Sequence, residues 1–192
     1  MDVLETTLDG VKVITPTIYG DDRGFFKEVI HPKKLANVGI NHRFVQMNHS
    51  KSQQWTLRGM HFQRSPYAQS KLVRCLRGRI FDVAVDIRPK SSTFGESFGV
   101  ELTEDNHKML YVPMGFAHGF LALTDCEVEY ACGDVYAVNY EVGLRWDDPT
   151  VGVQWPLDGQ SPILSKKDAD GVHLSELKQL EWPNEVYTTQ LL

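Results

Sequence analysis

The chain has little of what marks secreted, membrane-spanning or disulfide-stabilised proteins. Its first ten residues, MDVLETTLDG, carry acids and no apolar stretch, so we do not expect a signal peptide. No apolar run approaches the roughly 18 residues of a membrane span, and we predict no membrane partner. Cysteines are few: Cys75, Cys126 and Cys132 form no C-x-x-C pair. We therefore expect buried, reduced thiols in a cytoplasmic protein.

Several motifs of common enzyme classes are also missing. The chain has no G-x-G-x-x-G, no P-loop and no serine nucleophile elbow, so nicotinamide, ATP-driven and acyl-transfer chemistry lose support. A net charge of −5 argues against a general nucleic-acid binder. This total conceals an asymmetry, because residues 58–90 sum to +6 and residues 91–192 sum to −12. Such a basic stripe suits an anionic ligand.

Short strand patterns dominate the rest of the chain. The clearest runs from Ile80 to Ile87, where apolar side chains alternate with Asp82, Ala84 and Asp86. Similar runs occupy residues 11–15, 25–30, 43–48, 56–62, 71–77, 97–102, 109–112, 118–123 and 127–132. Turn-like segments separate them, among them GDDRG, NHSKS, RPKSS and PMG. This pattern predicts an all-β sandwich, jelly roll or barrel with two short helices, at residues 32–36 and 175–181.

The domain organisation is simple. Hydrophobic residues make up 42% of the chain and charged residues 23%, which is enough for a packed core. No repeat, low-complexity tract or linker interrupts the sequence. We predict a single domain over residues 1–175, followed by a peripheral C-terminal tail over residues 176–192.

Candidate chemical groups lie in and near the basic stripe. His61 sits in the strand-like LRGMHFQ, and Lys71 begins KLVRCLRGR. Taken alone, such a histidine is more often structural and such a lysine more often lies on the surface. Facing a barrel interior, however, Lys71 would be a fixed cation able to stabilise an oxyanion. Tyr130 lies on an alternating strand face and Tyr136 follows a turn, where each is also explained by aromatic packing.

A second histidine belongs to a recognisable pattern. His118 closes P-x-G-x-x-H (residues 113–118), which has the form of the second motif of the cupin superfamily. Metal-binding cupins carry H-x-H followed by a glutamate in their first motif, whereas the corresponding stretch here reads HFQ (residues 61–63). A catalytic metal usually has about three protein ligands, so we predict a cupin pocket without a metal ion.

Eight stretches of the chain form a further pattern: DDRGFFKE (21–28), QMNHSKS (46–52), LRGMHFQ (57–63), QSKLVRCLRGRIFDVAVDIRPKSSTFG (69–95), VPMGFAHGFLAL (112–123), EYACGDVYA (129–137), GLRWDDP (143–149) and PILSKKD (162–168). Taken together and in this order, they resemble one family, the dTDP-4-dehydrorhamnose 3,5-epimerases of deoxysugar-nucleotide biosynthesis. The resemblance implies a cupin-type double-stranded β-helix (jelly roll) that works as a cofactor-independent isomerase and as a homodimer. Its substrate would be a dTDP-sugar.

The resemblance also implies roles for matching positions. His61 looks like the catalytic base and Asp168 like its carboxylate partner. Lys71 matches the residue that faces the C4 oxygen of the sugar, and Tyr130 matches the acid on the opposite face. The matching substrate-binding positions are Arg58 and His118 in the pocket, and Arg23, Phe25, Gln46, Asn48 and Tyr136 around the nucleotide. Arg23 and Phe25 are expected to serve the site of the partner subunit.

These residue types suit the implied reaction. A ketone at C4 acidifies the protons on C3 and C5, and inversion removes a proton from one face and returns one to the other. An imidazole is a suitable base near neutral pH, an ammonium stabilises the enolate oxygen, and a phenol is a suitable acid. Two alternatives stay open: an epimerase of one centre, C3 or C5, on another 4-keto-deoxysugar nucleotide, and a non-catalytic cupin that binds a sugar nucleotide.

Three details qualify the match. Arg58 and His61 are three residues apart, so an ideal strand would place them on opposite faces. We therefore expect either a bulge at Gly59 or an Arg58 that acts from the rim of the pocket. Met47 stands where the family commonly has an acid, and Thr56 where it has a small aliphatic residue. Both departures concern the choice of substrate more than the reaction.

Overall fold

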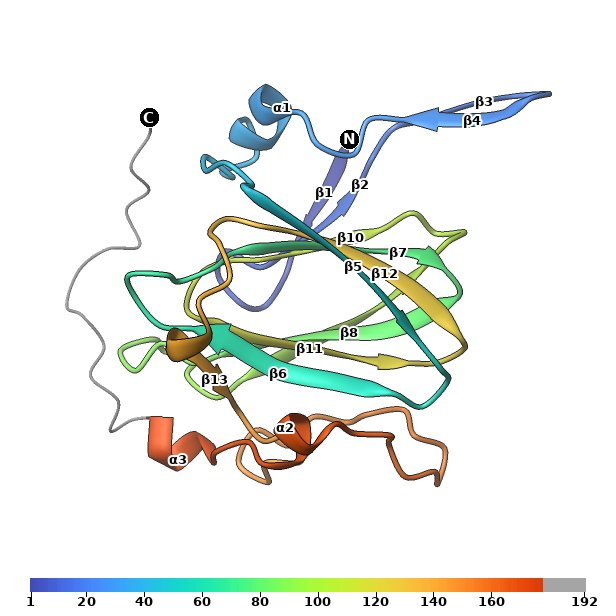
Figure 1. Ribbon diagram of the computed structural model, residues 1–192. Coiled ribbons are helices and arrows are strands. Elements are labelled where there is room, and N and C mark those ends of the chain that lie inside the picture. The colour runs from blue at the N-terminus through green and yellow to red at the C-terminus, as the bar shows by residue number, and fades with distance from the viewer. Residues whose placement is uncertain (178–192) are drawn as a thin grey trace.

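Two β-sheets lie face to face in the computed structural model, which describes residues 1–177 (Figure 1). The first sheet has the order β1 (Asp2–Glu5), β2 (Lys12–Thr15), β10 (Met109–Val112), β7 (Lys71–Arg77), β12 (Cys126–Cys132), β5 (Gln46–Ser52). The second has the order β13 (Glu141–Gly143), β6 (Leu57–Gln63), β11 (Phe116–Ala122), β8 (Arg79–Asp86), β9 (Ser97–Thr103). A separate hairpin pairs β3 (Ile18–Asp21) with β4 (Gly24–Lys27). The predicted all-β jelly roll is confirmed.

The helices are short and lie outside the sheets. They are α1 (Pro32–Ala36), the 3₁₀ turn η1 (Val138–Tyr140), α2 (Lys166–Ala169) and α3 (Leu174–Leu177). The helix predicted over residues 32–36 is confirmed, with Pro32 in the first turn, where its missing N–H costs nothing. None of the helices in the described residues is long and apolar enough to cross a membrane.

The alternation in β8 shows where the core lies. Ile80 and Ala84 belong to the apolar cluster between the two sheets, whereas Val83 and Val85 belong to a cluster on the outer face of the second sheet. The chain after β13 covers this outer face and contributes Leu174 to it. The apolar face predicted from the sequence therefore packs outward, under the C-terminal segment. The inward face carries Asp82, a buried carboxylate.

Several boundaries differ from the sequence prediction. The predicted turn NHSKS is wrong, since it forms the second half of β5. This strand lies at the edge of its sheet, and most of its side chains are exposed or half-buried. Its residues are therefore mostly polar, as in a turn, although they are paired as a strand. The short elements β1, β3, β13 and α2 were not predicted, since none of them carries a run of apolar residues that stands out from its surroundings.

The C-terminal predictions are described only in part. The helix predicted over residues 175–181 appears as α3, whose Leu177 is the last described residue and is fully buried. Residues 178–192, most of the predicted tail, lie outside the described residues. The division at residue 175 stays a prediction. The three cysteines, Cys75, Cys126 and Cys132, are free and buried, as expected.

Candidate active site

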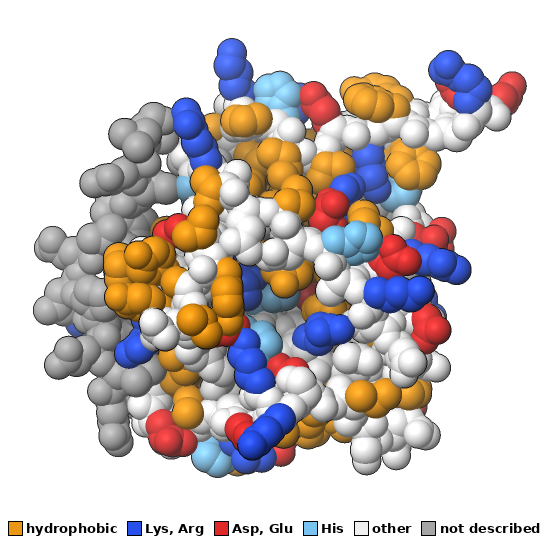
Figure 2. Space-filling view, viewed as in Figure 1, with side chains coloured by type: hydrophobic (Ala, Val, Ile, Leu, Met, Phe, Trp, Pro, Cys, Tyr) orange, Lys and Arg blue, Asp and Glu red, His pale blue; other side chains and the backbone are white. Residues whose placement is uncertain are grey.

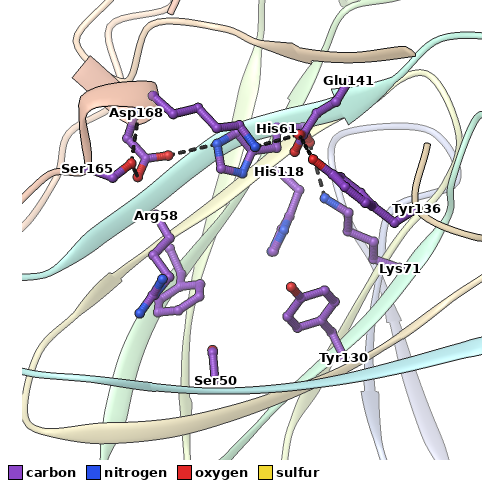
Figure 3. Close-up of a pocket in the computed structure, with 12 residues that line it drawn as sticks. Ser50, Arg58, His61, Lys71, His118, Tyr130, Tyr136, Glu141, Ser165 and Asp168 are labelled. Atoms are coloured by element: carbon purple, nitrogen blue, oxygen red, sulfur yellow. Dashed lines mark hydrogen bonds and ion pairs between the residues drawn. The ribbon is translucent and has the colours of Figure 1, made fainter. Parts of the chain in front are cut away.

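A cavity of about 340 Å³ opens between the two sheets. Figure 2 shows basic and histidine side chains gathered around a hollow on this face of the molecule. The cavity is lined by Ser50, Arg58, His61, Lys71, His118, Phe120, Tyr130, Tyr136, Glu141, Ser165, Lys167 and Asp168 (Figure 3). The four predicted catalytic residues, which come from four different elements, therefore meet in one place.

A bulge in β6 brings both Arg58 and His61 to the cavity. His61 is the register partner of His118, and Arg58 is the partner of Phe120, so three steps along β6 match two along β11. Gly59 takes up the extra residue at a φ of +127°, and an added Cβ there would lie 2.5 Å from the backbone of β11. Glycine is therefore required. Of the two alternatives expected here, a bulge at Gly59 or an Arg58 at the rim, the structure shows the bulge.

Asp168 is buried on α2 and faces His61. Its Oδ1 atom lies 2.7 Å from His61 Nε2, an ion-pair contact without an aligned hydrogen bond. The Gly59 N–H donates to Oδ1 at 3.2 Å, and the Ser165 hydroxyl donates to Oδ2 at 2.5 Å. Burial by itself raises the pKa of Asp168, but His61, Ser165 and the Gly59 N–H outweigh it and lower the pKa to about 2. Asp168 is thus an anion held by three groups.

Lys71 brings a cation to the same cavity. It is the first residue of β7, and its ammonium donates to the His61 carbonyl oxygen at 3.2 Å. Burial lowers the pKa of this ammonium, while nearby Cys132 and Glu141 oppose the shift. Of the two positions left open for Lys71, surface or interior, the structure shows the interior, because Lys71 lines the cavity.

His118 forms a second histidine–aspartate pair behind the cavity. Its Nε2 atom lies 2.8 Å from Oδ1 of Asp82, and both side chains are buried. The other carboxylate oxygen, Asp82 Oδ2, is buried without a hydrogen-bond partner. Burial lowers the pKa of His118, although Asp82 opposes the shift, so the ring is neutral near pH 7.

Tyr130 occupies the wall opposite His61 (Figure 3). It extends from β12, while its register partner in β5 is Asn48 and the next inward residue of β5 is Ser50. Burial raises the pKa of the Tyr130 phenol, which therefore keeps its proton at neutral pH. The Ser50 hydroxyl beside it is buried and has no hydrogen-bond partner.

Four lining residues that can act on a ligand were not predicted: Ser50, Glu141, Ser165 and Lys167. Glu141 accepts a hydrogen bond from the Tyr136 hydroxyl at 2.7 Å and pairs with Lys167 at 2.5 Å. A Ser-x-x-Asp pattern before a helix is a helix-start signal that could have identified Ser165. Nothing comparable marks Glu141, because β13 is three residues long.

The predicted nucleotide-binding residues fall into two groups. Gln46 donates to Asn48 at 2.9 Å and accepts the backbone N–H of Tyr136 at 2.8 Å, so these three lie together beside the cavity. Arg23 and Phe25 do not line the cavity of their own chain. They lie on the β3–β4 hairpin, which projects from the body, and the Arg23 side chain is 90% exposed (Figure 1).

The two departures from the family pattern lie away from the cavity. Met47 points outward from β5 and is 54% exposed, and Thr56 pairs with Ile163 in an isolated bridge. Within residues 1–177, no three side chains of His, Cys, Asp or Glu are grouped so that they could hold a metal ion.

Comparisons with known proteins agree with this geometry. A sequence model of the dTDP-4-dehydrorhamnose 3,5-epimerase family matches residues 5–176. The dTDP-4-dehydrorhamnose 3,5-epimerase of Methanothermobacter thermautotrophicus is 47% identical over 90% of this chain and 94% of its own. The enzyme of that name from Escherichia coli is 45% identical over 94% and 98%.

The similarity extends to solved structures. The crystal structure of dTDP-6-deoxy-D-glucose-3,5-epimerase RmlC from Legionella pneumophila, in complex with dTDP-4-keto-L-rhamnose, matches with a TM-score of 0.87 and 44% identity. The match covers 92% of this chain and 96% of that one. Because the family match spans every residue that lines the cavity, the chain belongs to the dTDP-4-dehydrorhamnose 3,5-epimerase family.

Proposed function

We propose that the protein inverts C3 and C5 of dTDP-4-dehydro-6-deoxy-D-glucose and so produces dTDP-4-dehydro-L-rhamnose. The observation that carries this proposal is the arrangement of a base and an acid on opposite walls of one cavity, with a cation between them. The names of the relatives and the ligand in the Legionella structure support the same substrate class. The reaction is an isomerisation that side chains can perform without a cofactor.

His61 is the base in this proposal. Because its Nε2 atom faces the Asp168 carboxylate, Nδ1 is the nitrogen whose lone pair is free to take a carbon-bound proton. Asp168 is ionised, so it orients the ring and stabilises the imidazolium that forms. A positioned base of this kind contributes about 10²–10⁴-fold to the rate.

Lys71 and His118 surround the oxygen on which charge develops. When the base removes the proton from C3 or C5, the electron pair of the broken C–H bond forms a double bond from that carbon to C4. The π electrons of the C4 carbonyl move onto its oxygen, which carries the negative charge of the enolate. The Lys71 ammonium is directed into the cavity to stabilise that oxygen. His118, held by Asp82, forms the neutral polar wall behind the sugar. One oxyanion site can serve both centres, because C3 and C5 flank the same carbonyl.

Tyr130 returns the proton from the opposite wall. Its phenol is protonated at neutral pH and faces the cavity from the first sheet, whereas His61 belongs to the second. Abstraction and reprotonation on opposite faces of the same carbon invert that carbon. Arg58 lies beside this path, with its Nε atom donating to Ser52 at 2.9 Å.

The nucleotide end of the substrate is assigned to two subunits. Gln46, Asn48 and Tyr136 lie beside the cavity of the same chain, and we assign Arg23 and Phe25 to the site of a partner in a homodimer. The hairpin that carries them exposes large apolar side chains, among them Tyr19 at 60% and Phe26 at 66%. An isolated two-stranded hairpin with such a surface is marginal in water, which favours cover by a second copy.

A mixing experiment tests the shared site. His61→Ala and Arg23→Ala variants are each expected to be inactive as pure proteins. When they are mixed and allowed to exchange subunits, a site with an intact His61 and the partner's Arg23 forms, and activity should return. Lack of recovery in mixed dimers, or a monomer in light scattering, would contradict the shared site.

The cytoplasm is the proposed location. All three cysteines are free and buried, which fits a reducing compartment.

Isotope exchange tests the reaction itself. The protein is incubated with dTDP-4-dehydro-6-deoxy-D-glucose in deuterated water, and NMR follows the label at C3 and C5. We expect deuterium at both carbons together with the L-rhamno product. Label at one carbon would instead establish a single-centre epimerase, and binding without label would establish a non-catalytic sugar-nucleotide binder.

A further inference from the structure

We propose that Ser165 is a positioning residue, whose hydroxyl holds the Asp168 carboxylate in the orientation that serves His61. Ser165 is the residue directly before α2, and none of the roles assigned above uses it. The inference rests on the proposed function, because it concerns the base of that reaction.

The two carboxylate oxygens of Asp168 are held by different groups. Oδ1 faces His61 Nε2 at 2.7 Å and accepts the Gly59 N–H at 3.2 Å. Oδ2 accepts the Ser165 hydroxyl at 2.5 Å. A carboxylate rotates in a broad well about its last torsion, so a contact on one oxygen leaves its plane poorly defined. The bond from Ser165 fixes the second oxygen and thereby the plane that His61 faces.

The same hydroxyl also fixes the backbone of Asp168. Ser165 Oγ accepts the Asp168 N–H at 3.2 Å, as an N-cap does. In an ordinary capping box, however, the acid three residues later bonds back to the N-cap backbone N–H. Here the carboxylate takes the serine hydroxyl and is turned toward His61. This departure from the usual local pattern points to a role beyond starting a helix.

The helix cannot supply this orientation alone. α2 has four residues, and a helix of that length has little stability of its own. Its Asp168 is nevertheless buried against β6, where a misdirected carboxylate would lose its contact with His61. The position of Asp168 therefore depends on side-chain contacts at the start of α2, and Ser165 provides two of them.

The expected effect is on turnover rather than on binding. Hydrogen-bonding partners that hold metal ligands in place typically contribute about 10–100-fold to activity. Ser165 holds Asp168 in a comparable way, so we expect a kcat loss of this size for Ser165→Ala. KM should change little, because the Ser165 hydroxyl donates to Asp168 and is not expected to contact the substrate. Ser165→Thr keeps a hydroxyl and the cap, so it should restore most of kcat.

The chain contains a matched control. Ser91 donates its hydroxyl to Oδ2 of the buried Asp86 at 2.6 Å, in a loop that does not line the cavity. Ser91→Ala removes a bond of the same kind, and its kcat should equal that of the wild type. Thermal unfolding of both alanine variants separates lost stability from lost turnover.

The experiment measures kcat, KM and deuterium exchange for the wild type, Ser165→Ala, Ser165→Thr and Ser91→Ala. A fall in kcat and in exchange confined to Ser165→Ala, with threonine rescue, supports the inference. If that variant does not fold, Ser165→Gly takes its place, since glycine is also accepted as an N-cap. Unchanged kcat, or a rise in KM alone, would overturn the inference. A wild type without exchange would overturn the proposed function as well.

Discussion

Two histidine–aspartate pairs face one cavity from neighbouring strands, and they differ in what surrounds them. His61 and His118 are register partners, and each contacts its aspartate through Nε2. The side chain of His61 is 24% exposed, whereas that of His118 is 7% exposed. Asp168 is held by two hydrogen-bond donors besides His61, whereas Asp82 keeps one oxygen without a partner. The same residue types therefore give one accessible, well-supported base and one buried polar wall.

Removal of each histidine tests this contrast and carries the largest expected effect. His61→Ala should lower kcat by about 10²–10⁴-fold and abolish exchange at both carbons, because the base is lost. His118→Ala should lower turnover less and retain some exchange. Steady-state assays and NMR in deuterated water measure both. His173 pairs with Asp148 away from the cavity, so His173→Ala is the matched control. Exchange that survives in His61→Ala and vanishes in His118→Ala would reverse the assignment.

Lys71 lines the same cavity as both histidines, and its replacement sharpens the comparison. Lys71→Met keeps much of the volume and removes the charge. Loss of a preorganised oxyanion donor typically costs about 2.7–4 kcal/mol, which corresponds to a 10²–10³-fold loss of kcat. The control is Lys12→Met, a largely buried lysine that pairs with Glu5 outside the cavity. Near-normal turnover in a folded Lys71→Met protein would show that charge stabilisation comes from His118 instead.

Tyr130 tests the opposite wall, where the expected loss is smaller and selective. Tyr130→Phe removes one hydroxyl, so it should reduce completed inversion by roughly 10²-fold, the lower end for acid catalysis. Exchange at the His61 face should fall less, because abstraction and return by the base remain. Tyr67→Phe, an aromatic contact of Tyr140 outside the cavity, serves as the control. An equal loss of exchange and inversion would place Tyr130 on the side of the base.

The contrast between the pairs also shows what a sequence can and cannot reveal. Periodicity identified β7, β8 and β12, because these strands are long and alternate clearly. The period of two does not say which face of β8 meets the other sheet. From the sequence, Asp82 was therefore only one of the residues that alternate with apolar side chains in this strand. In the fold it is the buried partner of His118.

Periodicity could not show how residues distant in sequence meet at the site. Asp168 reaches His61 across more than a hundred residues, and only the family resemblance connected them. Glu141 lies on a strand of three residues, which carries no periodic signal, and Ser165 only precedes a helix of four. The three-residue spacing of Arg58 and His61 conflicts with the alternation of a strand, which reduced the possibilities to a bulge at Gly59 or an Arg58 at the rim, and the structure decides for the bulge.

The smallest effect expected is on stability, and it concerns the carboxylate of the accessible pair. The pKa of Asp168 is lowered to about 2 in the folded protein, against about 3.9 for an unfolded aspartate. The contacts that lower this pKa contribute fully to the free energy of unfolding above about pH 4. Their contribution is lost as the pH falls from about 4 towards 2, because the carboxylate then becomes protonated. Denaturant unfolding at pH 5, 4 and 3 should therefore show a steeper loss for the wild type than for Asp168→Asn. Because Asp86 and Asp148, whose pKa values are also lowered, are common to both proteins, the difference isolates Asp168. If the two proteins lose stability equally as the pH falls, the contacts of Asp168 orient His61 without stabilising the ionised carboxylate of Asp168.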